Sequence, residues 1–229
     1  MVPSSPRPTR RVIAWILVGV VIGLSAAGVF ALWEAHRSAQ LLATIDFRTH
    51  GPEVPDNVLD SVRGAEERAY ADMGIPRRLA EDVQDALALL SPRLAFARDY
   101  SLGPYRIKAS TVSETLDYAL DKGYLTVRRQ PSGEYRDVLP QFALQPSIND
   151  WEASVLLDML KNRHPQLSRM SWAQIAADPN AIAKLYSGYM GAGGDWAAWA
   201  ADDIPGPVAR QRLGYDPATG GYAAVAPAS

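Results

Sequence analysis

An unbroken stretch of 22 uncharged residues, from Val12 to Trp33, constrains this chain more than any other feature of its sequence. A helix needs about 20 predominantly apolar residues to cross the hydrocarbon core of a bilayer. Trp15 and Trp33 lie near the two ends of the stretch, where amphipathic rings favour the membrane interface. The sequence therefore predicts a single N-terminal transmembrane helix over residues 12–33.

The charges that flank this stretch predict its orientation. Three arginines (Arg7, Arg10 and Arg11) precede it, and no acidic residue occurs before Glu34. Because positive charge is retained on the cytoplasmic side, residues 1–11 form a basic cytoplasmic N-terminus in this interpretation, and the chain beyond Trp33 lies outside. The expected location is the cytoplasmic (inner) membrane, with the C-terminal domain in the periplasm or outside the cell.

A cleaved signal peptide is the alternative interpretation of the same stretch. Small residues do occur at Ser25, Ala26 and Ala27, but the apolar run continues past them and is long for a signal-peptide core. An uncleaved anchor is therefore favoured. Gly19 and Gly23 have the spacing with which membrane helices pair, which is a basis for weak dimerisation.

Composition excludes several classes of function. The formal net charge of −2 gives no global electrostatic reason to bind nucleic acid. The chain has no cysteine, so disulfides and thiolate metal sites are excluded, and its three histidines (His36, His50 and His164) lack ligand spacing. We therefore expect no metal, no organic cofactor and no nucleic-acid partner.

The remaining chain reads as a tether and one mostly helical domain. Turn-rich residues 34–55 predict the tether, helical periods dominate residues 56–213, and the Ala-, Gly- and Pro-rich residues 214–229 predict a disordered tail. Within the domain, two alternating arms around Pro131-Ser132-Gly133 predict one short β-hairpin over residues 124–138. The expected fold class is mainly α, or α+β with that single hairpin.

Glu66 is the carboxylate whose position best suits acid chemistry. The residues Val58, Val62, Ala65, Ala69 and Met73 form the apolar stripe of the first domain helix. At about 100° per residue, Glu66 falls roughly 60° from the centre of that stripe and Glu67 roughly 160° from it. An acid at the edge of a buried face has a raised pKa, as a general acid needs, whereas Glu67 is expected in solvent.

Two short segments resemble lysozyme-like lytic transglycosylases. "YSLGPYRIKAST", residues 100–111, is similar to the S-x-G-x-x-Q-I-x-P-S-T segment that lines the glycan cleft in that family. "IAKLYSGYMG", residues 182–191, resembles the later A-x-x-Y-N-G element, whose tyrosine approaches the catalytic glutamate. Three positions depart from these patterns, since Arg106 replaces the glutamine, Ala109 the proline and Ser187 the asparagine.

A third segment points to the same acid. "AEERAYADMGI", residues 65–75, resembles the E-D-x-x-F-x-x-H-x-G-I segment of peptidoglycan glycosyltransferases, which are lysozyme-like relatives. Either resemblance implies a lysozyme-like fold, peptidoglycan glycan strands as substrate, and Glu66 as general acid and base. The resemblance also implies four substrate-binding residues, namely Ser101, Tyr105, Arg106 and Tyr186. Ser110 or Thr111 is expected to cap the helix behind this segment.

Two other functions remain open from the sequence. A non-catalytic single-pass envelope protein could use the same domain to bind glycan or a protein partner, and Arg106 in place of the family glutamine favours that function. A glycan-polymerising transferase would need a large basic, lipid-facing surface, which the sequence does not provide.

Overall fold

The computed structural model describes the backbone of residues 9–47, 51–127, 134–191, 196–201 and 205–223, without the side chains of residues 9–22, 24, 46–47, 134–135 and 196–197. These residues form a mostly helical molecule with three small two-stranded sheets, so the prediction of a mainly α fold is confirmed. Within the described part of the chain, no helix combines the length and the apolar character needed to cross a membrane. The side chains of residues 12–22, half of the predicted span, lie outside the described residues, as do residues 1–8.

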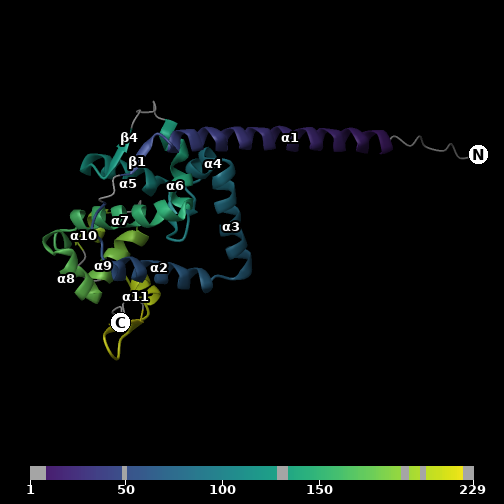
Figure 1. Ribbon diagram of the computed structural model, residues 1–229. Coiled ribbons are helices and arrows are strands. Elements are labelled where there is room, and N and C mark those ends of the chain that lie inside the picture. Colours follow the sequence, from purple (N-terminus) through teal and green to yellow (C-terminus); the bar gives the residue numbers. More distant parts are fainter. Residues whose placement is uncertain (1–8, 48–50, 128–133, 192–195, 202–204, 224–229) are drawn as a thin grey trace, which may run out of the picture.

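A single long helix, α1 (Thr9–Leu42), opens the fold and projects from the body of the molecule (Figure 1). Its last turns belong to that body, because Glu34 and Ser38 are buried there. Strand β1 (Ile45–Phe47) follows and pairs antiparallel with β4 (Leu125–Val127). The prediction of a tether over residues 34–55 is therefore wrong for most of its length.

Three helices follow. They are α2 (Asp56–Ala71), α3 (Ile75–Leu90) and α4 (Pro92–Ala97). Gly74, in extended conformation, separates α2 from α3, and Pro76 occupies the first turn of α3, where its missing N–H costs no helical bond. Helix α3 ends at Leu90, and Pro92 then occupies the first position of α4.

A short hairpin leads into the next helix. Strand β2 (Ser101–Leu102) pairs with β3 (Ile107–Lys108), and α5 (Ala109–Lys122) starts directly after it. The predicted cap at Ser110 or Thr111 is wrong, because the carboxylate of Asp99 accepts the Ser110 N–H at 2.8 Å and Thr111 is buried inside the helix. Gly123 ends α5 with a left-handed φ of 70°.

The hairpin predicted over residues 124–138 is wrong. Its first arm does form β4, but that strand pairs with β1 from the start of the domain. The end of its second arm, Glu134–Val138, is a 3-10 helix (η1), and residues 128–133 lie outside the described part of the chain. The alternating pattern of apolar and polar residues therefore predicted strand β4 correctly and its pairing partner incorrectly.

Helix α7 (Pro146–Arg163) forms the centre of the core. It contacts α5, α6 (Leu139–Leu144), α9 (Pro179–Met190) and α2, and buried residues occur on every face of it. Its middle, residues 155–160, is buried throughout, as expected of a helix in the interior. In Figure 1, α5 and α6 lie above α7, while α2 and α9 lie below it.

Short elements complete the C-terminal half. They are η2 (Leu167–Arg169), α8 (Trp172–Ala177), α10 (Trp196–Ala201), α11 (Pro207–Arg212), β5 (Tyr215–Asp216) and β6 (Gly221–Tyr222). The prediction of a disordered tail from residue 214 is wrong up to residue 223. Strands β5 and β6 pair there, and the buried Tyr222 donates from its hydroxyl to Asn180 on α9 at 3.3 Å. Residues 224–229 lie outside the described residues.

Candidate functional site

Glu66 lies on the buried side of α2. The apolar residues Val58, Val62 and Ala65 anchor this helix in the core, against α7, α9 and α11. The helical phase then turns Glu66 inward, with an exposed fraction of 6%, while its neighbour Glu67 is exposed. The two adjacent glutamates therefore differ in environment as the sequence predicts.

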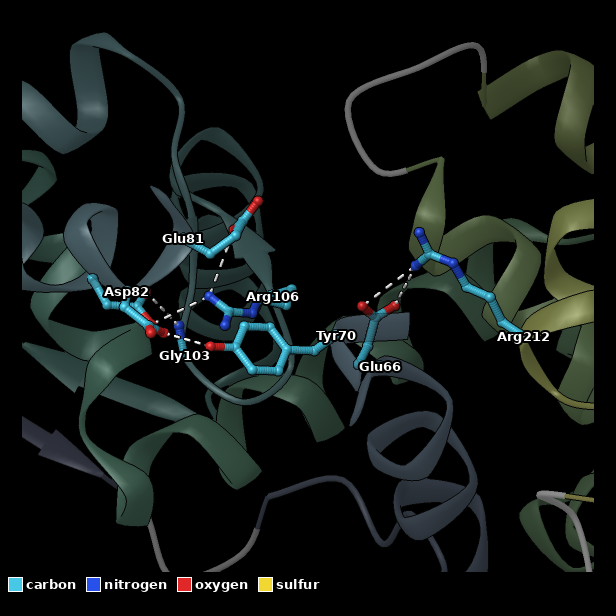
Figure 2. A network of polar contacts seen from close by, with 8 residues as sticks. Glu66, Tyr70, Glu81, Asp82, Gly103, Arg106 and Arg212 are labelled. Carbon is cyan, nitrogen blue, oxygen red and sulfur yellow. Dashed lines mark hydrogen bonds and ion pairs between the residues drawn. The ribbon is translucent and has the colours of Figure 1, made fainter. Parts of the chain in front are cut away.

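Two side chains from distant parts of the chain hold the Glu66 carboxylate. The Tyr186 hydroxyl, on α9, donates to Glu66 Oε1 at 2.6 Å. Arg212 Nη1, on α11, donates to Oε1 at 3.1 Å and to Oε2 at 3.4 Å, and lies 3.3 Å from the Tyr186 hydroxyl. Figure 2 shows the guanidinium of Arg212 facing the Glu66 carboxylate.

Burial dominates the electrostatics of this cluster. Loss of solvation raises the pKa of Glu66 above its ordinary value, although the Tyr186 hydroxyl and the Arg212 cation act in the opposite direction. Burial likewise raises the pKa of Tyr186, together with the negative charge of Glu66. The tyrosine hydroxyl therefore keeps its proton and remains the donor to Glu66.

Glu66 lies in the wall of a cavity of about 180 Å³. Ser101, Arg106 and Tyr189 line the same cavity, so the structure brings Glu66, the Ser101 turn and Arg106 together as the sequence predicts. Tyr186 is fully buried behind this wall, where its hydroxyl holds the Glu66 carboxylate. It does not line the cavity, so the prediction of Tyr186 as a substrate-binding residue is wrong. A second cavity, of about 510 Å³, shares the side chains of Met73, Arg77 and Arg212 with the first. The two form neighbouring hollows on either side of Arg212.

The turn between β2 and β3 is held by the inner face of α3. Gly103 has a left-handed φ of 69°, and Arg106 has a φ of 51°, which is uncommon for a residue with a side chain. Arg106 Nη1 lies 3.2 Å from Asp85 Oδ2 and 3.6 Å from Glu81 Oε2, both on α3. These ion pairs fix the strained turn and occupy the guanidinium of Arg106, and Figure 2 shows the one with Glu81.

Tyr105 is not placed to bind a substrate. Its side chain is fully buried, and its hydroxyl accepts a hydrogen bond from Arg63 at 3.0 Å. The Tyr189 hydroxyl donates to the Tyr105 carbonyl oxygen, so the residue connects the turn to α9. The prediction of Tyr105 as a substrate-binding residue is wrong, because the turn directs this ring into the core.

Sequence reasoning missed Arg212 and a second buried acid. Arg212 resembles an ordinary basic residue in the last turn of a short helix, and no local pattern indicates its approach to Glu66. Glu152, on α7, is fully buried without a hydrogen-bond partner among the described residues, and burial raises its pKa to about 8. Both residues need the tertiary structure to be recognised.

In the part of the chain that the structure describes, no group of three or more His, Asp or Glu side chains is arranged to hold a metal ion. Comparisons with protein-family models, with curated proteins and with solved structures find no match to this chain.

Proposed function

We propose that this protein is a membrane-anchored enzyme of lysozyme-like fold that cleaves peptidoglycan glycan strands, as a lytic transglycosylase does. One observation carries the proposal: Glu66 is a buried acid with a raised pKa in the wall of a cavity, and a tyrosine hydroxyl holds one of its two oxygens. A raised pKa keeps such an acid protonated to higher pH than an ordinary glutamate, which suits it to protonating a glycosidic oxygen.

The proposed reaction uses Glu66 first as acid and then as base. Its protonated Oε2 donates to the glycosidic oxygen, the bond from that oxygen to the anomeric carbon breaks, and an oxocarbenium-like state forms. The hydroxymethyl oxygen of the same sugar then bonds to the anomeric carbon and returns its proton to Glu66. Tyr186 donates to Oε1 throughout, so in this proposal the transferred proton is carried by Oε2.

An internal nucleophile suits this cavity better than a carboxylate does. Glu81 is the other acid in the cavity wall, and its carboxylate is paired with Arg106 at 3.6 Å.

The location outside the cytoplasm is part of the same proposal. The uncharged run of residues 12–33 would anchor the protein, with α1 continuing from the bilayer into the domain. Large apolar side chains on this part of α1 are exposed, namely Val29, Phe30, Leu32 and Trp33. Exposed apolar side chains on a projecting helix are expected if lipid surrounds that helix.

A second function is supported by the ion pair between Arg212 and Glu66. A cation 3.1 Å from a carboxylate favours its charged form, which cannot donate a proton. A non-catalytic envelope protein that binds glycan or a protein partner would tolerate this pairing. The two functions differ in whether glycan bonds are broken.

A zymogram of peptidoglycan separates these functions. The wild-type protein is expected to clear the gel, and Glu66→Gln, which keeps the shape but loses the acid, is expected to lower clearing by about 10²-fold or more. Glu67→Gln is the matched control, because this neighbour is exposed, and it should retain clearing. No clearing by the folded wild-type protein, or equal loss in both variants, would contradict Glu66 as the catalytic acid.

A further inference from the structure

Helix α3 is amphipathic, but its charged face points toward the body of the molecule and its apolar face points away from it. Its inner face carries Glu81 and Asp85, which pair with Arg106, and Asp85 also accepts from the Gly103 N–H at 3.4 Å. Its outer face carries Ile75, Leu79, Val83 and Leu90, with exposed fractions of 81%, 61%, 48% and 50%. A helix of a water-soluble domain normally has the opposite arrangement.

The four exposed side chains form one continuous stripe, which we call the outer stripe of α3. Positions 75, 79 and 83 repeat every fourth residue, and position 90 is seven residues further, so all four lie on one face of the helix. Their exposure means that none of the described elements covers this face. Contiguous exposed apolar surface of this kind marks an interaction site.

The position of α1 indicates what covers the outer stripe. Helix α3 contacts α1 and α4, and in Figure 1 it stands on the side of the body from which α1 projects, running across the direction of α1. In Figure 1 this contact lies near the place where α1 leaves the body. Along α1, Glu34 is buried, while Trp33 before it is exposed. If α1 enters a bilayer there, α3 lies along the surface of that bilayer.

We propose that the outer stripe of α3 rests on the lipid surface of the membrane in which α1 is anchored. Helices that lie in the membrane interface insert an apolar face into the boundary between headgroups and acyl chains. This inference rests on the anchoring part of the proposed function, and it is independent of the glycan chemistry.

The proposal has a consequence for the candidate site. Arg77 and Glu81 of α3 also line the cavity that contains Glu66. With the outer stripe on the lipid, this cavity opens close to the membrane surface and its orientation is fixed relative to the bilayer. The enzyme would then act on the glycan strands nearest to the membrane.

Single cysteine labels test this contact, because the chain has no cysteine of its own. The full-length protein is reconstituted into vesicles of phosphatidylethanolamine and phosphatidylglycerol with brominated acyl chains, which quench a bimane label only on contact with lipid. Leu79→Cys reports the outer stripe, Val29→Cys reports α1, and Asp121→Cys, at an exposed position of α5, is the control. We expect bromine quenching at positions 79 and 29 and none at position 121.

Each other outcome overturns the proposal at a different point. Quenching at position 29 without quenching at 79 would leave the anchor in place and refute the lipid contact of α3. Protection of position 79 from water without bromine quenching would identify a protein, or a second copy of this chain, as the occupant of the stripe. Absence of quenching at both positions would refute the anchor and, with it, the contact of α3, whereas the zymogram would still decide the chemistry.

Discussion

At the scale of single residues, Arg212 opposes the effect of burial on Glu66. Burial raises the pKa of the carboxyl group, and the guanidinium 3.1 Å from Oε1 lowers it. An acid catalyst works only while it is protonated, so its rate falls as the pH rises through its pKa. Arg212 therefore limits the highest pH at which Glu66 stays protonated and the proposed enzyme stays active.

Replacing Arg212 with methionine should raise that limit. Without the cation, the effect of burial on the pKa of Glu66 is opposed less, so this pKa should rise. The pH at which the rate falls off on the alkaline side should therefore increase by about 1 pH unit or more. The measurement is the rate at which soluble glycan fragments are released from peptidoglycan as a function of pH. Arg210→Met is the control on the same helix, since Arg210 lies over the Tyr215 ring. An unchanged alkaline fall-off in Arg212→Met would mean that another group limits the rate.

At the scale of elements, the turn between β2 and β3 depends on the absence of a side chain at Gly103. A Cβ at this position would overlap the carbonyl oxygen of Ala143 and approach the Asn149 amide nitrogen to 2.9 Å. The left-handed φ of 69° adds a conformational cost for any residue other than glycine. The turn thus packs its backbone directly against the end of α6.

Two glycine substitutions should have opposite effects on stability. Gly103→Ala is expected to lower the free energy of unfolding by about 2 kcal/mol or more, from the left-handed conformation and the overlap together. Gly64→Ala, in the middle of α2 with no atom within 4 Å of its added Cβ, should raise it by about 0.5–1 kcal/mol. Urea denaturation followed by tryptophan fluorescence measures both. Similar effects at the two positions would show that Gly103 is not constrained.

Local pattern predicted the helices well because their signals lie within a few residues. The spacing of Val58, Val62 and Ala65 was enough to predict the phase of α2 and the inward direction of Glu66. The partner of β4 could not be predicted in this way, because β1 precedes β4 in the sequence and helices α2 to α5, with the hairpin of β2 and β3, separate the two strands. Arg212 is a similar case, since its partner Glu66 is 146 residues away. Pairing across such separations leaves no periodic pattern in the sequence.

At the scale of the whole molecule, the arginines before the apolar run predict which side of the membrane holds the C-terminal domain. A reporter that is active only in the cytoplasm should be silent when fused after Trp33, because positive charge keeps residues 1–11 inside. The same reporter fused after Arg11 should be active and serves as the control. Activity of the Trp33 fusion would place the domain in the cytoplasm, away from peptidoglycan.

The order in which the chain is made bears on when the Glu66 site becomes complete. Glu66 is synthesised first, Tyr186 follows 120 residues later, and Arg212 comes last, 146 residues after Glu66. A partly synthesised chain carries Glu66 without the two groups that hold its carboxylate. If the proposed function holds, the site is therefore incomplete until α9 and α11 have been made and packed against α2, and a nascent or truncated chain would not cleave glycan.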